Sequence, residues 1–130
     1  MRSYDVAITS LVISAPVKWT DNILSQYDVP DVVLKRRGVA RKIPHSALIR
    51  LALVRELHTE LGLGVRDALR LAEEVLATGE SAVPSRGHLR VTYDRQALED
   101  ALSLRLRDAL ESAPTPQRGR PRRGQAGDRS

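Results

Sequence analysis

Apolar residues recur at helical spacing in five stretches of the chain, and each stretch predicts an α-helix. The first stretch, residues 4–13, is ambiguous because its β-branched residues also favour a strand, and we predict a short helix there. Residues 14–16 interrupt it, since Pro16 disfavours a helical conformation in the residue before it. A second short helix is predicted over residues 17–27. Its apolar residues lie on one side: Trp19, Ile23 and Leu24.

Two longer helices are predicted in the middle of the chain. Pro44 opens the longest one, which extends to about residue 61 and carries a broad apolar face. Gly62 and Gly64 end it, because glycine is frequent just past helix ends. The next helix covers residues 65–77 and has its own apolar face.

Short strands are predicted on either side of these helices. Residues 32–34 and 39–43 are predicted to form a hairpin with a basic tip. Residues 80–87 are polar and contain a proline and a glycine, so a linker is predicted. A strand is predicted at residues 89–93, where apolar and polar residues alternate.

The last two segments differ in composition. Asp94 is predicted to cap a helix that extends to about residue 112, and we interpret its apolar stripe, with the preceding strand, as a dimerisation element. Between residues 114 and 130, six of 17 residues are proline or glycine, and no apolar residue is larger than alanine. Such a segment cannot bury enough apolar surface to fold alone, so it is predicted to be disordered.

These elements predict a mainly α fold in three parts. Residues 1–79 form a head like a winged helix-turn-helix, with a small β-hairpin. Residues 80–113 supply the linker, a C-terminal strand and a helix. Residues 114–130 form a disordered basic tail.

The charge is distributed unevenly along the chain. The net charge of the 130 residues is +5, but residues 35–42 carry +5 and residues 114–130 carry +4, which leaves −4 on the remainder. A mildly acidic body with two basic clusters favours a polyanionic partner, because phosphate neutralisation releases counterions. A GC-rich genome would explain 18 Arg against 3 Lys, but it would not explain the clustering.

Several function classes lack their motifs. The chain has no cysteine, and its three histidines lack the spacing of metal ligands. The common catalytic and nucleotide-binding motifs do not occur, so we expect no enzymatic activity and no cofactor. A secretory signal and an apolar stretch of about 18 residues are both missing, so we expect a cytoplasmic, nucleoid-associated protein.

The order of elements over residues 4–78 is that of a winged helix-turn-helix, in which the second helix enters the major groove and the hairpin lies along the DNA backbone. Residues 5–77 resemble the DNA-binding head of MerR-type regulators. The segment APVKWTDNILSQYDVP corresponds to their recognition helix. The segment KRRGVARKIPHSALIRLALVRELHTELGLGVRDAL corresponds to their wing, the long helix and the ELGL bend. No long coiled coil or effector domain follows, so no small-molecule effector is expected.

The resemblance implies two sets of DNA contacts. The base-facing side chains would be Lys18, Asn22 and Gln26, because amides can bind adenine and lysine can reach guanine acceptors. The phosphate-binding side chains of the wing would be Lys35, Arg36, Arg37, Arg41 and Lys42. An ordinary solvated helix face would also explain the first set. Trp19 is interpreted as a core residue.

The tail contains a second DNA-binding pattern. Its R-G-R-P sequence, Arg118, Gly119, Arg120 and Pro121, resembles the centre of an AT-hook and is followed by Arg122 and Arg123. Glycine would let an extended chain lie close to the floor of an A·T minor groove while the arginines enter its negative potential. A solubilising tail or a general polybasic arm would have the same composition.

We therefore expect a homodimeric protein that binds double-stranded DNA, as a transcriptional regulator or a nucleoid-associated factor. The alternative is a protein-interaction module, such as an antitoxin-like or adaptor protein, that docks a partner through the helices between residues 44 and 77.

Overall fold

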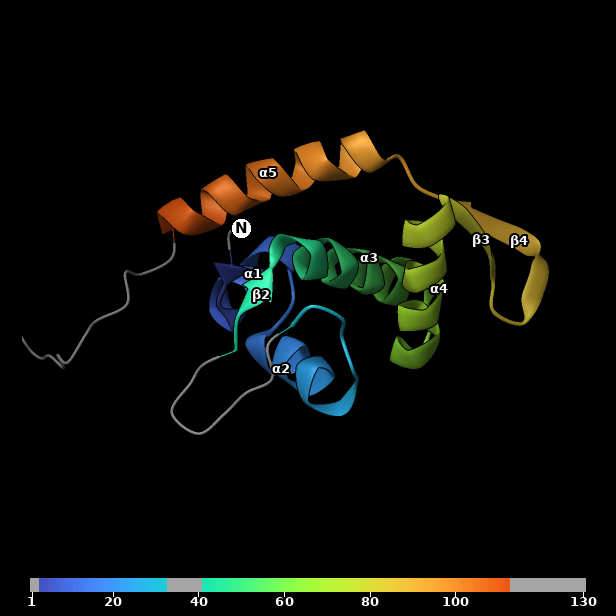
Figure 1. The fold of residues 1–130 in the computed structure, drawn as a ribbon, viewed down its shortest axis with the longest axis horizontal. Coiled ribbons are helices and arrows are strands. Elements are labelled where there is room, and N and C mark those ends of the chain that lie inside the picture. The colour runs from blue at the N-terminus through green and yellow to red at the C-terminus, as the bar shows by residue number, and fades with distance from the viewer. Residues whose placement is uncertain (1–2, 33–40, 113–130) are drawn as a thin grey trace, which may run out of the picture.

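The structure is a computed structural model that describes residues 3–32 and 41–112. These residues form five helices and two short antiparallel strand pairs, which confirms the predicted mainly α fold (Figure 1). The elements in chain order are β1 (Ser3–Tyr4), α1 (Val6–Ile13), α2 (Val17–Gln26), β2 (Ile43–Pro44), α3 (His45–Leu61), α4 (Val65–Thr78), β3 (Glu80–Val83), β4 (Arg86–Thr92) and α5 (Arg95–Ser112). In the described part of the chain, no helix combines the length and the apolar character needed to cross a membrane.

The ambiguous first stretch is a helix, as predicted. Asp5 caps α1, because its side chain accepts a hydrogen bond from the Ile8 amide at 2.7 Å. Ser14 ends the helix in the left-handed conformation, with φ 58° and ψ 46°, and the Ala15 amide donates to the Ser10 carbonyl. Pro16 immediately precedes the first residue of α2. Residues 14–16 are therefore the whole connection between the two helices, and they form a tight turn.

The first strand pair joins two distant segments. Tyr4 in β1 pairs with Ile43 in β2, and both side chains are buried. Residues 33–40, which include most of the predicted basic hairpin, lie outside the described residues. In the described structure, the strand at Ile43 therefore pairs with the N-terminal segment.

Two clusters of buried side chains share the long helix α3. The N-terminal core brings together α1, α2, β1, β2, the first half of α3 and α5, and its buried residues include Val12, Ile23, Ile43, Leu48, Leu51 and Leu102. The α4 core brings together the second half of α3, α4 and β3, and its buried residues include Val54, Leu57, Leu71, Val75 and Val83. Trp19 packs partly against both cores, so its interpretation as a core residue is confirmed in part.

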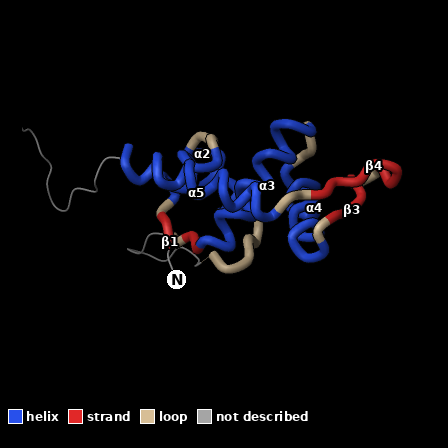
Figure 2. Tube along the Cα trace, turned by 90° about the horizontal axis from the view of Figure 1, so that it is seen from above, coloured by secondary structure: helices blue, strands red, loops and turns tan. Residues whose placement is uncertain are grey.

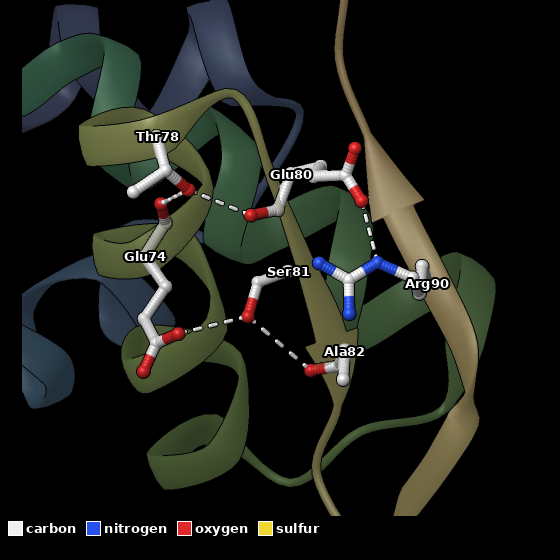
Figure 3. A network of polar contacts seen from close by, with 6 residues as sticks. All are labelled: Glu74, Thr78, Glu80, Ser81, Ala82 and Arg90. Carbon is white, nitrogen blue, oxygen red and sulfur yellow. Dashed lines mark hydrogen bonds and ion pairs between the residues drawn. The ribbon is translucent and has the colours of Figure 1, made fainter.

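The predicted linker at residues 80–87 is wrong, because residues Glu80–Val83 form a strand that pairs with β4. The strand was hidden because its first residues are polar, and two bonds attach it to α4: the buried Ser81 hydroxyl donates to Glu74 at 2.9 Å, and the Thr78 hydroxyl donates to the backbone carbonyl of Glu80 at 2.7 Å (Figure 3). Val83 is buried in the α4 core. The intervening proline and Ser85, whose φ is 64°, form the turn of a hairpin.

The last helix starts where the sequence predicts. Asp94 accepts a hydrogen bond from the Ala97 amide at 3.0 Å and so caps α5. The helix runs back along the molecule, away from the β3–β4 hairpin, and its far end lies near α1 (Figures 1 and 2). Part of its apolar stripe is used within the chain, because Leu102 and Ala109 are buried in the N-terminal core.

Candidate nucleic-acid interface

The outer face of α2 is polar and exposed. Three of its exposed residues are the predicted base-facing side chains, Lys18, Asn22 and Gln26. Because they are spaced four residues apart, they form one ridge along the helix, about 12 Å from first to last at 1.5 Å rise per residue. The structure therefore brings these three residues together on one surface.

The inner face of α2 fixes the direction of that ridge. Ile23 and Leu24 are buried in the N-terminal core. Thr20 is fully buried as well, and its hydroxyl accepts a hydrogen bond from the Ser10 hydroxyl of α1 at 2.8 Å. A buried hydrogen bond between two side chains has a narrow range of allowed geometries, so it orients α2 on α1 more strictly than apolar packing does.

Arg55 of α3 supports the turn between the two helices. Its guanidinium donates to the Ser14 carbonyl at 3.2 Å, and its central carbon lies 4.8 Å from the centroid of the Trp19 ring. A cation over an indole ring is attracted to the negative face of the ring. Arg55 thus ties the turn and the start of α2 to α3. The sequence alone does not reveal this role, because no local spacing connects Arg55 to partners about 40 positions away.

Arg41 and Lys42 are both predicted phosphate-binding residues, but only Lys42 is exposed. Its guanidinium pairs with the Asp21 carboxylate and donates to the Ser25 hydroxyl at 2.9 Å, and its side chain is only 12% exposed. The segment that enters β2 is therefore attached to the side of α2. Lys42, the next residue, is exposed. In this structure Arg41 compensates the only carboxylate of α2, and Lys42 is directed to solvent.

The remaining predicted DNA contacts cannot be placed on the described surface. Lys35, Arg36 and Arg37 lie in residues 33–40, outside the described residues. The tail residues Arg118, Gly119, Arg120, Pro121, Arg122 and Arg123 are also outside them. The ends of the first segment are described: Arg41 binds α2, and Asp31 accepts a hydrogen bond from Ser46 at the start of α3. The described residues before this segment are therefore attached to α3, and those after it are attached to α2.

Comparisons with protein-family models, with curated proteins and with solved structures find no match to this chain. The resemblance to the MerR-type head therefore stays a prediction, and the functional proposal depends on the geometry of the residues described above.

Proposed function

We propose that this protein binds double-stranded DNA and that α2 is the helix that enters the major groove. The observation that carries the proposal is the exposed ridge of Lys18, Asn22 and Gln26 on a helix that follows another helix after a tight turn. Lysine and carboxamide side chains supply the donors and acceptors that recognise base edges. An α-helix with its side chains is about 10–12 Å wide, close to the ~12 Å width of the major groove.

The charges around the ridge support the same partner. Asp21 is the only acidic residue of α2, and its pairing with Arg41 compensates its charge. Lys18 within the ridge and Lys42 next to Arg41 are exposed cations, and the segment between α2 and β2 contributes three more cations by sequence. Cations at the edge of a recognition helix would bind phosphates and position the helix without reading sequence.

A homodimer is part of the proposal. Helix-turn-helix proteins usually read two half-sites about one turn of DNA apart, which requires two recognition helices in one assembly. The exposed leucines of α5, Leu104 and Leu110, are candidates for the dimer contact. The biological role would be transcriptional regulation or nucleoid organisation, with the AT-hook-like tail binding an adjacent minor groove.

The alternative is a module that docks a protein partner through residues 44–77. Most apolar side chains of α3 and α4 are buried in the two cores, and Leu61 is the one large apolar side chain of these two helices that is exposed, so the apolar surface open to a partner is confined to the end of α3. Charge reversal of Arg36 and Arg37 would distinguish the two functions. It should abolish duplex binding if the protein binds DNA, whereas loss of a protein complex with unchanged duplex binding would favour the docking module.

The test is a fluorescence-anisotropy titration of the full-length chain with a duplex selected from a randomised pool, over a series of salt concentrations. Asn22→Ala should weaken binding by about 5- to 150-fold, since a good bidentate contact contributes ~1–3 kcal/mol to discrimination. Lys18→Gln should weaken binding and relax the preference for guanine at the position that it contacts.

Matched controls for these two variants are available outside the ridge. Gln96→Ala removes an exposed amide on α5, and Arg70→Gln removes an exposed cation on α4. Neither should change affinity for the selected duplex by more than about twofold. The proposal is wrong if no duplex binds even at low salt, or if the control variants lose as much affinity as the ridge variants.

A further inference from the structure

A groove between α3, the end of β4 and α5 is separate from the α2 ridge. Its volume is about 400 Å³. Apolar side chains from two helices line it, including Leu57 and Leu61 of α3 and Leu98 of α5. Leu61 is 53% exposed, so much of this apolar lining is open to solvent. Tyr93 adds an aromatic ring to one side of the groove.

The rim of the groove is acidic. Glu56 and Glu60 are one turn apart on α3, both are exposed, and neither makes an ion pair with another residue of the described ranges. Asp94 adds a third carboxylate, and Arg105 is the only basic residue among those that line the groove. Like charges four residues apart on a helix repel each other, so a cation between them would be stabilising. An apolar floor with an acidic rim favours a ligand that is both apolar and basic.

The chain carries a segment of that chemistry directly after α5. Residues 114–130 contain five arginines and three prolines against one aspartate. Arginine binds carboxylates through two parallel hydrogen bonds, stacks on aromatic rings and covers apolar surface with its aliphatic stem. Proline-rich segments dock in grooves that contain aromatic side chains. We propose that the arginine- and proline-rich tail docks into the groove of its own chain.

The length of the tail fits this position. The groove lies beside the first half of α5, from Arg105 back to Asp94. Measured along the helix axis at 1.5 Å per residue, these two residues are about 10 Å and about 27 Å from Ser112. An extended chain from Ser112 reaches at most ~20 Å at Arg118 and ~40 Å at Arg123. The arginines can therefore reach the whole groove, at an effective concentration of the order of millimolar.

Docking would regulate the proposed DNA binding, and this consequence rests on that proposed function. The same arginines cannot bind the groove and a minor groove at once. DNA would therefore compete with Glu56 and Glu60 for the tail. If half of the tails are docked, the apparent affinity of the tail for the minor groove is reduced about twofold, because only the undocked tails are competent.

The test uses a nitroxide label on the tail of the full-length chain. The sequence contains no cysteine, so Ala126→Cys gives a single attachment site. Amide resonances of Leu61 and Ala101 should lose at least about half of their intensity at about 0.01 M salt and recover at about 1 M, as the Debye length falls from ~30 Å to ~3 Å. Glu56→Gln with Glu60→Gln should abolish the loss. The control, Asp100→Asn with Glu111→Gln, makes the same charge change at exposed positions outside the groove lining and should preserve it.

Four results would overturn the proposal. The first is an intensity loss confined to the last turn of α5, and the second is an equal loss in both double variants. The third is an intensity loss at the groove in a mixture in which one chain carries the spin label and another chain carries the observed amides. That result would assign the groove to the tail of a second copy. Chemical shifts at the groove that depend on protein concentration, without any effect of the label, would likewise mean that the body of a second copy occupies it.

Adding an A·T-rich duplex separates this inference from the proposed function. Recovery of the groove resonances on addition of duplex supports both. If no duplex binds and the intensity loss at the groove persists, the docking is supported and the DNA-binding function is rejected. Duplex binding in a chain that shows no loss at the groove would reject the docking alone.

Discussion

The two cores differ in how they hold their helices. The α4 core is aliphatic apart from its contact with Trp19 and Tyr93, and it joins elements that are close in sequence. The N-terminal core joins residues as distant as Tyr4 and Ala109, and next to it lies the buried hydroxyl pair of Ser10 and Thr20. The α4 core therefore depends on local packing, whereas the N-terminal core depends on distant contacts and on polar geometry.

This difference indicates where precision is needed. The inner face of α2 belongs to the N-terminal core, and the proposed role of α2 requires that it is held in one orientation so that the side chains of its exposed ridge can meet base edges. The buried hydroxyl pair and the Arg55 contact with Ser14 supply that orientation. The α4 core has only to support α3 and the β3–β4 hairpin, for which close packing is sufficient.

The largest expected effect comes from truncating one leucine in each core. Leu71→Ala and Leu102→Ala each remove a side chain that is at most 1% exposed, and each should lower the free energy of unfolding by about 2–5 kcal/mol. Chemical denaturation measures the loss, and amide exchange distinguishes the cores: Leu102→Ala should increase exchange mainly in α5, and Leu71→Ala mainly in α4.

The control for these variants is Leu11→Ala, because Leu11 of α1 is 52% exposed and lies outside both cores and outside the proposed dimer contact. It should change stability by less than about 0.5 kcal/mol. Equal increases of exchange throughout the chain in both core variants would mean that the two cores unfold as one unit.

The second effect concerns the polar contact between α1 and α2. Ser10→Ala leaves the hydroxyl of the fully buried Thr20 without its partner, which should cost about 1–3 kcal/mol of stability. The double variant Ser10→Ala with Thr20→Val removes both hydroxyls and should recover most of that loss. If orientation is the role of this pair, the double variant should still bind the selected duplex more weakly than the wild type.

The sequence predicted the elements whose signals are local. The turn at residues 14–16, the cap at Asp94 and the exposed ridge of α2 each follow from neighbouring residues, and the structure contains all three. The strand at residues 80–83 was missed because its polar side chains have partners in other elements: Ser81 donates to Glu74 of α4, and Glu80 pairs with Arg90 of β4. Polar residues next to a proline are usually a loop, and here tertiary contacts override that tendency.

Other features could not be predicted, because they join residues that are far apart in sequence. Arg41 is predicted to bind phosphate, but in the structure it pairs with Asp21 and is attached to α2. The groove needs α3 and α5 side by side, and their helical patterns do not say which faces meet. Amphipathic patterns show that a face is buried, but not against which partner.

The third effect concerns the contact through which α3 supports α2. Arg55→Met keeps most of the aliphatic stem but removes the guanidinium over Trp19, and it should cost about 0.5–2 kcal/mol. Trp19 is the only tryptophan, so its fluorescence reports the change directly. Arg66→Met, at an exposed position of α4, is the matched control and should leave both stability and fluorescence unchanged. An unchanged Trp19 spectrum in Arg55→Met would show that the cation does not interact with the ring in solution.

The smallest effect is expected in the β3–β4 hairpin. Arg90 pairs with Glu80 across the two strands, but the side chains are 54% and 48% exposed (Figure 3). Exposed ion pairs gain little because water screens them, so Arg90→Gln should cost no more than about 1 kcal/mol, and the cost should disappear at about 1 M salt. Ser81→Ala, by contrast, removes a buried donor to Glu74 and should cost more than Arg90→Gln at every salt concentration. A larger loss of stability in Arg90→Gln than in Ser81→Ala would mean that the ion pair on the exposed face of the hairpin, rather than the attachment of the hairpin to α4, holds it in place.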